Sequence, residues 1–166
     1  MEIWSESFSL YANDDGSKRM KYYLAYGSNL NKEQMHYRCP QAKPIGTAVI
    51  DNHELVFRGN TQGVLTIEPK EDSSVPVGVW LITEKCERAL DIYEGYPTLY
   101  KKEYIKIEHQ GKTIEALIYI MNRKLEHVAP SFRYLDIVIE GYKDFGFDHL
   151  FISRAISGFK VRVIES

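Results

Sequence analysis

Residues 21–30 read KYYLAYGSNL and lead from a strand into a helix. The first half of this run is rich in aromatic residues, which favours a strand, and Gly27 ends it. Asn31 with Gln34 three residues later matches a capping box, so the sequence predicts a short helix over residues 32–37. The order strand, loop, helix leaves a short polar loop between two regular elements.

Apolar runs separated by Gly, Pro, Asn or Asp come next, and each predicts a strand. Four short runs lie at residues 45–50, 54–57, 64–67 and 77–82. Two longer runs, residues 99–108 and 114–121, flank a connection in which Gly111 is expected to take a positive φ, so they predict a hairpin. This spacing indicates an antiparallel sheet or barrel.

A helix is expected after Thr83, which can act as its N-cap. One apolar face at positions i, i+3, i+4 and i+7 is made of Cys86, Ala89, Leu90 and Tyr93. Gly95 is the expected C-terminal stop, which makes Glu94 the last helical residue.

The C-terminal part of the chain is expected to add two helices and a strand. Ser131 can cap a helix that reaches about Phe145, and Asp148 can cap a second that reaches Ser157. Alternating apolar residues over 159–163 predict a closing strand. Together these elements indicate the α+β class with a strand-rich core.

The composition is that of one globular domain. Of the 166 residues, 44% are hydrophobic and 27% are charged. The net charge of -2 comes from 21 basic and 23 acidic residues spread along the chain, so we expect no nucleic-acid partner. No apolar run has the length of a signal peptide, so we expect a cytoplasmic protein with no membrane partner. Nothing in the sequence indicates its oligomeric state.

Cysteines and histidines give no sign of a metal site. Cys39 and Cys86 are far apart in the sequence and have no C-x-x-C partner, so we expect both to be reduced and structural. The histidines show no metal-binding spacing; they are His36, His53, His109, His127 and His149.

The first nineteen residues differ from the rest of the chain. A polar, turn-rich stretch over 13–19 ends just before a second methionine, Met20. We therefore expect an N-terminal extension over 1–19 and one domain over 20–166. Apolar residues of the extension, Trp4, Phe8, Leu10 and Tyr11, could dock on this domain or on a neighbour.

The loop from Tyr26 to Leu30 is the first candidate site. Gly27, Ser28 and Asn29 can expose backbone N–H groups, which would hold a carboxylate or a developing oxyanion. A plain strand-to-helix turn is the competing interpretation, and spacing alone favours it, because Gly, Ser and Asn are common turn residues. The loop has neither the P-loop pattern nor G-x-S-x-G around Ser28.

Glu94 is the second candidate. It ends a predicted helix beside several aromatic residues, and both the negative helix end and desolvation raise the pKa of a carboxyl group. Such a group suits proton transfer near neutral pH. A solvated surface glutamate is the competing interpretation. Asp91 shares its helix face, but two carboxylates on one helix do not flank a sugar-sized gap, so a glycosidase is not indicated and Asp91 is expected to be structural.

Four motifs in this order resemble the gamma-glutamylcyclotransferase-like family. They are Tyr26-Gly27-Ser28-Asn29-Leu30, Leu90-Asp91-Ile92-Tyr93-Glu94-Gly95, Tyr100, and Pro130-Ser131-x-x-Tyr134. The resemblance runs from Lys21 to about Gly146. Arg38-Cys39-Pro40 is also similar to family members, although no chemistry is assigned to it.

The resemblance implies a mixed, mainly antiparallel β-barrel surrounded by short helices. It implies a reaction in which the α-amine of a γ-glutamyl group attacks its own γ-carbonyl, giving 5-oxoproline and a free amine or amino acid. No metal or cofactor is required. Glu94 would act as general base and then general acid, and Tyr100 and Tyr134 would donate hydroxyl hydrogen bonds beside the loop.

Three points stay open at this stage. The substrate can be any of several γ-glutamyl compounds, and the loop amides from Gly27 to Leu30 can hold either the α-carboxylate or the γ-carbonyl oxygen. A non-catalytic binding module for γ-glutamyl-like small molecules is the alternative function.

Overall fold

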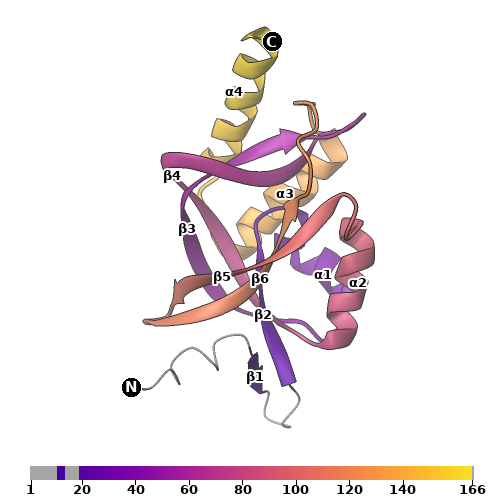
Figure 1. Cartoon of the computed structure of the whole chain (residues 1–166), viewed down its shortest axis with the longest axis vertical. Helices are drawn as coiled ribbons and strands as arrows, with labels where there is room; N and C mark the ends of the chain where they lie inside the picture. The colour runs from indigo at the N-terminus through magenta and orange to yellow at the C-terminus, as the bar shows by residue number, and fades with distance from the viewer. Residues whose placement is uncertain (1–10, 14–18, 166) are drawn as a thin grey trace.

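A computed structural model describes the backbone of residues 11–13 and 19–165 and the side chains of residues 19–158. Its strands are β1 (Tyr11–Asn13), β2 (Arg19–Ala25), β3 (Lys43–Arg58), β4 (Val64–Ile82), β5 (Tyr100–His109) and β6 (Lys112–Met121). Its helices are the short 3-10 turn η2 (Ser28–Leu30), α1 (Lys32–Arg38), α2 (Glu84–Glu94), α3 (Phe132–Phe145) and α4 (Leu150–Glu165) (Figure 1). The predicted α+β class is confirmed.

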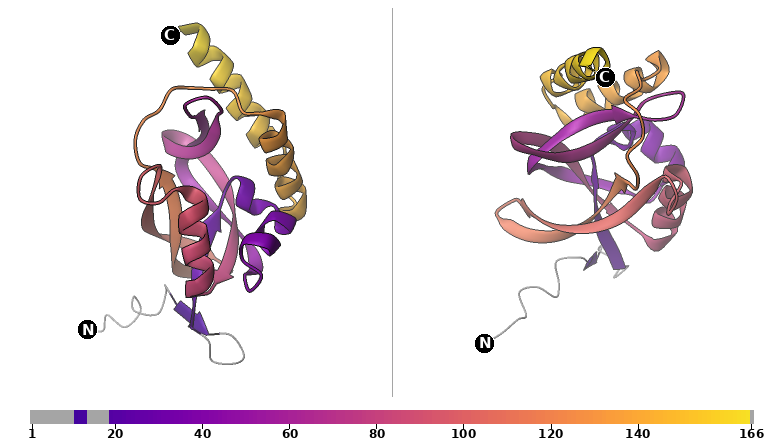
Figure 2. Two further views of the ribbon diagram at one scale, coloured as in Figure 1. Left: turned by 90° about the vertical axis from the view of Figure 1, so that its right-hand side faces the viewer. Right: turned by 45° about the horizontal axis from the view of Figure 1, so that its top comes forward.

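The strands form one mixed, mainly antiparallel sheet in the order β3-β4-β2-β6-β5, with β1 added beside β2. Among the described strands, only the pairing of β2 with β6 is parallel. The sheet curls so that β3 and β5 approach each other (Figure 2). Two side chains at the end of β5 bridge the strands. His109 hydrogen-bonds to the Thr47 carbonyl at 3.2 Å, and Gln110 donates to the Ile45 carbonyl. Over the described residues no backbone ladder joins β3 to β5, so the barrel is open.

The helices cover the sheet in two groups (Figure 2). Helices α1 and α2 contact each other, whereas α3 packs on η2 and α4 packs on β3. The barrel interior is apolar, with fully buried side chains that include Leu24, Phe57, Val77, Ile82 and Leu117. No helix within the described segments has the length and apolar character needed to cross a bilayer.

Two pairs of predicted short strands are single long strands in the structure. β3 runs through residues 51–53, where the register shifts and Asn52 has φ 56°. β4 runs through residues 68–75, where Asp72 has φ 64° and its amide donates to the Asn52 side chain. Asn and Asp tolerate the left-handed region, so residues that signal turns here form bulges within continuous strands.

The predicted closing strand over 159–163 is wrong. Helix α4 continues from Leu150 to Glu165, starting where the Asp148 carboxylate accepts a hydrogen bond from the Leu150 amide. Extending a helix that has already formed fixes one residue per hydrogen bond, so a short alternating run does not stop it. The helix that was expected to begin after Ser131 ends at Phe145, as predicted.

The expectation of two reduced cysteines is also wrong. Cys39, which caps the end of α1, forms a disulfide with Cys86 in the first turn of α2. Their Cα atoms are 4.9 Å apart although 47 positions separate them in the sequence. Folding, and not spacing along the chain, brings the two helix ends together, so no sequence pattern indicates the pair.

Candidate active site

A cavity of about 210 Å³ opens between the end of β2, the C-terminal end of α2 and the start of α3. Tyrosines dominate its wall, and Glu94 is its one carboxylate. It is lined by Tyr23, Leu24, Tyr26, Gly27, Ser28, Asn29, Val64, Leu65, Tyr93, Glu94, Leu99, Tyr100, Tyr119 and Tyr134. The structure therefore gathers in one cavity all the predicted site residues except Leu30.

Glu94 reaches the cavity because α2 begins and ends where the sequence predicts. The Thr83 hydroxyl accepts a hydrogen bond from the Cys86 amide at the start of the helix. Gly95 ends it in the left-handed conformation, with φ 65° and ψ 35°. This conformation suits glycine, so the chain turns sharply just after Glu94.

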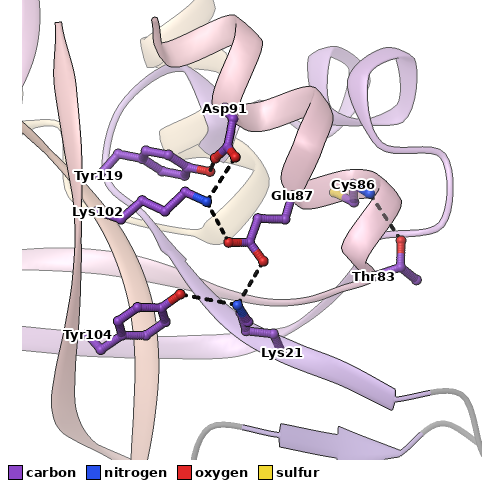
Figure 3. Close-up of polar contacts among 8 residues, drawn as sticks. All are labelled: Lys21, Thr83, Cys86, Glu87, Asp91, Lys102, Tyr104 and Tyr119. Atoms are coloured by element: carbon purple, nitrogen blue, oxygen red, sulfur yellow. Dashed lines mark hydrogen bonds and ion pairs between the residues drawn. The ribbon is translucent and has the colours of Figure 1, made fainter. Parts of the chain in front are cut away.

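A network of charged side chains fastens α2 to the sheet (Figure 3). Glu87 pairs with Lys21 of β2 at 2.8 Å and with Lys102 of β5 at 2.7 Å. Lys102 also pairs with Asp91 at 2.8 Å, and Asp91 accepts a 2.5 Å hydrogen bond from the hydroxyl of Tyr119. These side chains are mostly buried, so the network fixes the helix one turn before Glu94.

Glu94 has no comparable ionic partner. Within the described part of the chain no cation lies at ion-pair distance from its carboxylate, whose neighbours are the neutral groups of the cavity. Burial raises the pKa of Glu94 from its ordinary value of 4.5 to about 7, and the positive charge of Arg38 opposes this rise. Two carboxylates on one helix face therefore differ in environment: Asp91 is ion-paired, and Glu94 is placed to exchange a proton near neutral pH.

Asn29 is the hydrogen-bonding neighbour of Glu94. Its side-chain Nδ2 donates to Oε1 of Glu94 at 3.3 Å and to the Tyr23 hydroxyl at 2.9 Å. Its Oδ1 accepts from Arg38 at 2.9 Å. The loop thus contributes a side-chain amide that contacts the candidate base, in addition to its backbone.

Tyr100 and Tyr134 bind the backbone of the same residue, Leu65, with opposite polarity. The Tyr100 hydroxyl donates to the carbonyl oxygen of Leu65 at 2.6 Å, whereas the Tyr134 hydroxyl accepts from the Leu65 amide at 3.0 Å. A hydroxyl group has one proton, so Tyr134 keeps its proton for a ligand and Tyr100 offers only lone pairs. This differs from the expectation that both tyrosines donate.

The remaining loop residues make hydrogen bonds to different parts of the protein. Tyr26 donates to the carbonyl of Tyr119 at 2.6 Å, and Ser28 shares a 2.8 Å hydrogen bond with the Tyr93 hydroxyl. Leu30 is fully buried in the core, and its amide donates to the Gly27 carbonyl. Leu30 therefore packs in the core next to the loop and does not line the cavity.

Sequence reasoning missed several residues of the cavity, namely Tyr23, Leu65, Leu99, Tyr119 and the adjoining Arg38. Tyr23 lies three residues before Tyr26 in a recognised strand, and Arg38 lies in a recognised motif, so signals existed for both. Leu65 and Tyr119 carried none, because only strand pairing brings them to the loop. Tyr93, expected on the buried face of α2, lies at the cavity and is 43% exposed.

No group of three or more His, Cys, Asp or Glu side chains in the described segments is arranged to hold a metal ion. The donors that the cavity offers are hydroxyl groups, one amide side chain and one carboxylate.

Comparisons with known proteins agree with this arrangement. A family model described as gamma-glutamyl cyclotransferase, AIG2-like, matches residues 23–136. The human gamma-glutamylcyclotransferase is 33% identical over 135 residues, which cover 75% of this chain and 71% of the human one. The protein of the same name from Bos taurus is 32% identical over 138 residues, covering 75% and 71% of the two chains.

A solved structure of a gamma-glutamyl cyclotransferase superposes with a TM-score of 0.72. It is 28% identical, and the match covers 81% of this chain and 85% of that one. The matched region holds every residue that lines the cavity, from Tyr23 of β2 to Tyr134 of α3. On the family model and the shared identity, this chain belongs to the gamma-glutamyl cyclotransferase, AIG2-like, family of enzymes.

Proposed function

We propose that this protein is a γ-glutamyl cyclotransferase, which converts a γ-glutamyl compound into 5-oxoproline and a free amine or amino acid. Glu94 is its general base and general acid. The relatives named gamma-glutamylcyclotransferase support the type of reaction. The environment of Glu94 supports its assignment as the general base and general acid.

One observation carries the proposal: a lone carboxyl group with a pKa of about 7 lies in a cavity whose other walls are neutral. An α-ammonium group must lose a proton before its nitrogen can attack, and a base with a pKa near the working pH does this best. A solvated glutamate would be too weak a base. The burial of Glu94 therefore supplies the property that the reaction needs.

The reaction balances with the one carboxylate. Glu94 takes a proton from the α-ammonium group, and the freed amine attacks the γ-carbonyl carbon, so that a C–N bond forms and the carbonyl oxygen becomes an oxyanion. Glu94 returns its proton to the leaving nitrogen, whose bond to the carbon breaks as the carbonyl re-forms. The ring nitrogen then still carries one proton more than the amide of 5-oxoproline, and Glu94 transfers this second proton to the released amine, which leaves as an ammonium ion. The enzyme ends in its starting state, and no step calls for a metal or an electron carrier.

The polarity of the tyrosines supports one orientation of the substrate. Tyr100 can only accept, so its lone pairs suit the N–H groups of the α-ammonium beside Glu94. Tyr134 can donate, and its hydroxyl adjoins Gly27 at the start of the loop. We assign the α-carboxylate to Tyr134 and the loop, because hydrogen-bond donors gather there and carboxylates accept from several donors.

Incubation of the purified protein with a panel of γ-glutamyl amino acids and γ-glutamylamines tests the proposal. Release of 5-oxoproline, detected by mass spectrometry, is expected for at least one member and identifies the substrate class. If a compound raises the melting temperature but is never turned over, the protein is a binding module and the proposal is wrong. The cytoplasmic location stays a prediction, which cell fractionation checks.

A further inference from the structure

Arg38 adjoins the cavity, and its guanidinium group contacts the side chains of Asn29, Gln34 and Tyr93. Its Nη1 donates to Oδ1 of Asn29 at 2.9 Å, and its Nη2 donates to Oε1 of Gln34 at 3.0 Å. Its guanidinium carbon lies 3.5 Å from the centre of the Tyr93 ring. The planar group is thus held on both edges and on one face, an arrangement that a lysine cannot reproduce.

This contact determines the orientation of the Asn29 amide. A guanidinium group can only donate, so the atom of Asn29 that faces Arg38 has to be the carbonyl oxygen. The NH₂ group must then point the other way, toward Glu94 and Tyr23, as observed. Both of its protons are used: one on the Glu94 carboxylate and one on the Tyr23 hydroxyl.

The opposite orientation of the amide would disfavour the base. With its carbonyl oxygen toward Glu94, Asn29 would repel the carboxylate and favour the protonated acid, which cannot take up a proton. Nothing in the Asn29 side chain itself selects between the two orientations, because an amide is nearly symmetric in shape. The selection comes from Arg38.

We propose that Arg38 is a positioning residue of the cyclotransferase reaction: it holds the Asn29 amide with its NH₂ group on Glu94 and so keeps Glu94 in the form that accepts a proton. The inference rests on the proposed function for its catalytic consequence. Its structural part, the control of Glu94 through Asn29, stands on the hydrogen bonds alone.

The surroundings of Arg38 fix it relative to the helix that carries Glu94. Tyr93, on which Arg38 stacks, directly precedes Glu94 in α2. Cys39, the next residue after Arg38, is bonded to Cys86 at the other end of the same helix. Arg38 and Glu94 therefore keep their relative positions.

The charges around Glu94 give Arg38 a second, electrostatic effect. Of the described groups that influence the Glu94 carboxylate, Arg38 alone is positively charged, and it opposes the rise of the Glu94 pKa. The other titratable groups that face Glu94 are tyrosines: Tyr23 of β2, Tyr26 of the loop that follows it, Tyr93 of α2, Tyr100 of β5 and Tyr134 of α3. None of these tyrosines can supply a positive charge in place of Arg38.

The test replaces Arg38 in two ways. Arg38→Met keeps an apolar stem against Tyr93 but removes the guanidinium, so the acid limb of kcat/KM against pH should move to higher pH by roughly one unit. Activity at pH 7 should fall about fivefold, because the ionised fraction of Glu94 falls by this factor. Arg38→Lys keeps the positive charge but not the planar guanidinium group. The acid limb of its pH profile should therefore move less than that of Arg38→Met, while its activity should still fall below that of the wild type.

Two further variants separate positioning from general damage. Arg154→Met makes the same change of net charge on α4, beside a different cavity, and should leave the pH profile unchanged. Asn29→Ala removes the group through which Arg38 is proposed to act. In the double variant the two losses should therefore not multiply, since residues that act as a unit show strong coupling.

The apo protein provides a readout that needs no substrate. Carbon-13 NMR of the glutamate carboxyl groups, with Glu94 assigned from the Glu94→Gln spectrum, should show a higher pKa in Arg38→Met than in the wild type. An unchanged Glu94 titration, or fully multiplicative losses with Asn29→Ala, overturns the inference even if the enzyme is active. If the titration shifts but no γ-glutamyl compound is turned over, the proposed function falls and the control of Glu94 by Arg38 stands.

Discussion

The hydroxyl oxygen of Tyr134 lies 3.3 Å from the position that a Cβ atom at Gly27 would take. Such a contact is tighter than ordinary packing, and the Leu65 side chain stands on the same side at 3.6 Å. A side chain at residue 27 would thus press on the Tyr134 hydroxyl, whose proton is free for a ligand. Glycine is needed here for space beside the cavity.

We expect Gly27→Val to reduce kcat/KM at least a hundredfold, because its branched side chain displaces the Tyr134 hydroxyl from the loop. Ser28→Ala should reduce it less than tenfold, since it removes only the hydrogen bond to Tyr93 and leaves the backbone amides in place. Steady-state kinetics with circular dichroism of both variants would check this. Ordinary kinetics in a folded Gly27→Val protein would contradict the placement of the loop.

The two tyrosines that bind Leu65 should affect different ends of the substrate. Tyr100→Phe removes an acceptor, so it should weaken a ligand with an α-amine roughly tenfold and leave a glutaryl amide, which lacks that amine, unaffected. Tyr134→Phe removes a donor and should weaken both ligands equally. Calorimetric titration of each variant with each ligand measures the pattern. Equal losses for both ligands in both variants would disprove the assigned polarity.

Local patterns predicted the elements that carry the site. The capping residues of α1, α2 and α3 are short-range signals, so Asn31, Thr83 and Ser131 were recognised as N-caps from the sequence. The bulges at Asn52 and Asp72 have the sequence signal of turns, because a residue with a positive φ gives the same signal in a loop and within a paired strand. Only pairing between β3 and β4 distinguishes the two.

The candidate site was predicted as far as its residues lie in continuous motifs. Glu94 and the loop from Tyr26 to Asn29 line one cavity, as expected. The acceptor of the Tyr100 hydroxyl has no signal in the sequence, because it is the Leu65 carbonyl, which comes from a strand far away in the sequence. Likewise, the contact of Arg38 with Asn29 requires the packed α1, which no spacing rule describes.

Removal of residues 1–19 should leave the enzyme active. The first cavity residue is Tyr23. The described part of the extension is β1 and Arg19, and β1 pairs with the first residues of β2, at the end of that strand opposite the loop. Trp4, Phe8 and Leu10 lie outside the described residues. A chain starting at Met20 should retain kcat and KM within about twofold but melt a few degrees lower, since β2 loses an edge partner. A folded, inactive truncated protein would contradict the predicted boundary.

Glu94→Gln should abolish turnover without unfolding the protein. The amide has the size of the carboxyl group but cannot accept a proton, so kcat should fall by roughly 10² to 10⁴ or more. KM should change much less, because the contacts made by Tyr100, Tyr134 and the loop remain. The measurement is kcat and KM on the substrate found in the panel, with circular dichroism on the same sample. Near-normal kcat would remove Glu94 from the mechanism.

The same variant should change the pH dependence of stability. Glu94 titrates near 4.5 when unfolded and near 7 when folded, so between these values the folded state binds more protons. Stability contributed by the neutral form is therefore lost as pH rises from 4.5 to 7, and above pH 7 the buried charge costs roughly 3 kcal/mol. Glutamine removes this cost because it stays neutral.

The melting temperature of Glu94→Gln should thus exceed that of the wild type by several degrees at pH 8, and the difference should shrink toward zero near pH 4.5. Differential scanning calorimetry of both proteins over this range gives the comparison. Glu71→Gln is a matched control, because it makes the same change at an exposed position of β4 and should show no such dependence on pH. A constant difference at all pH values would mean that the carboxyl group of Glu94 is not held in its neutral form by burial.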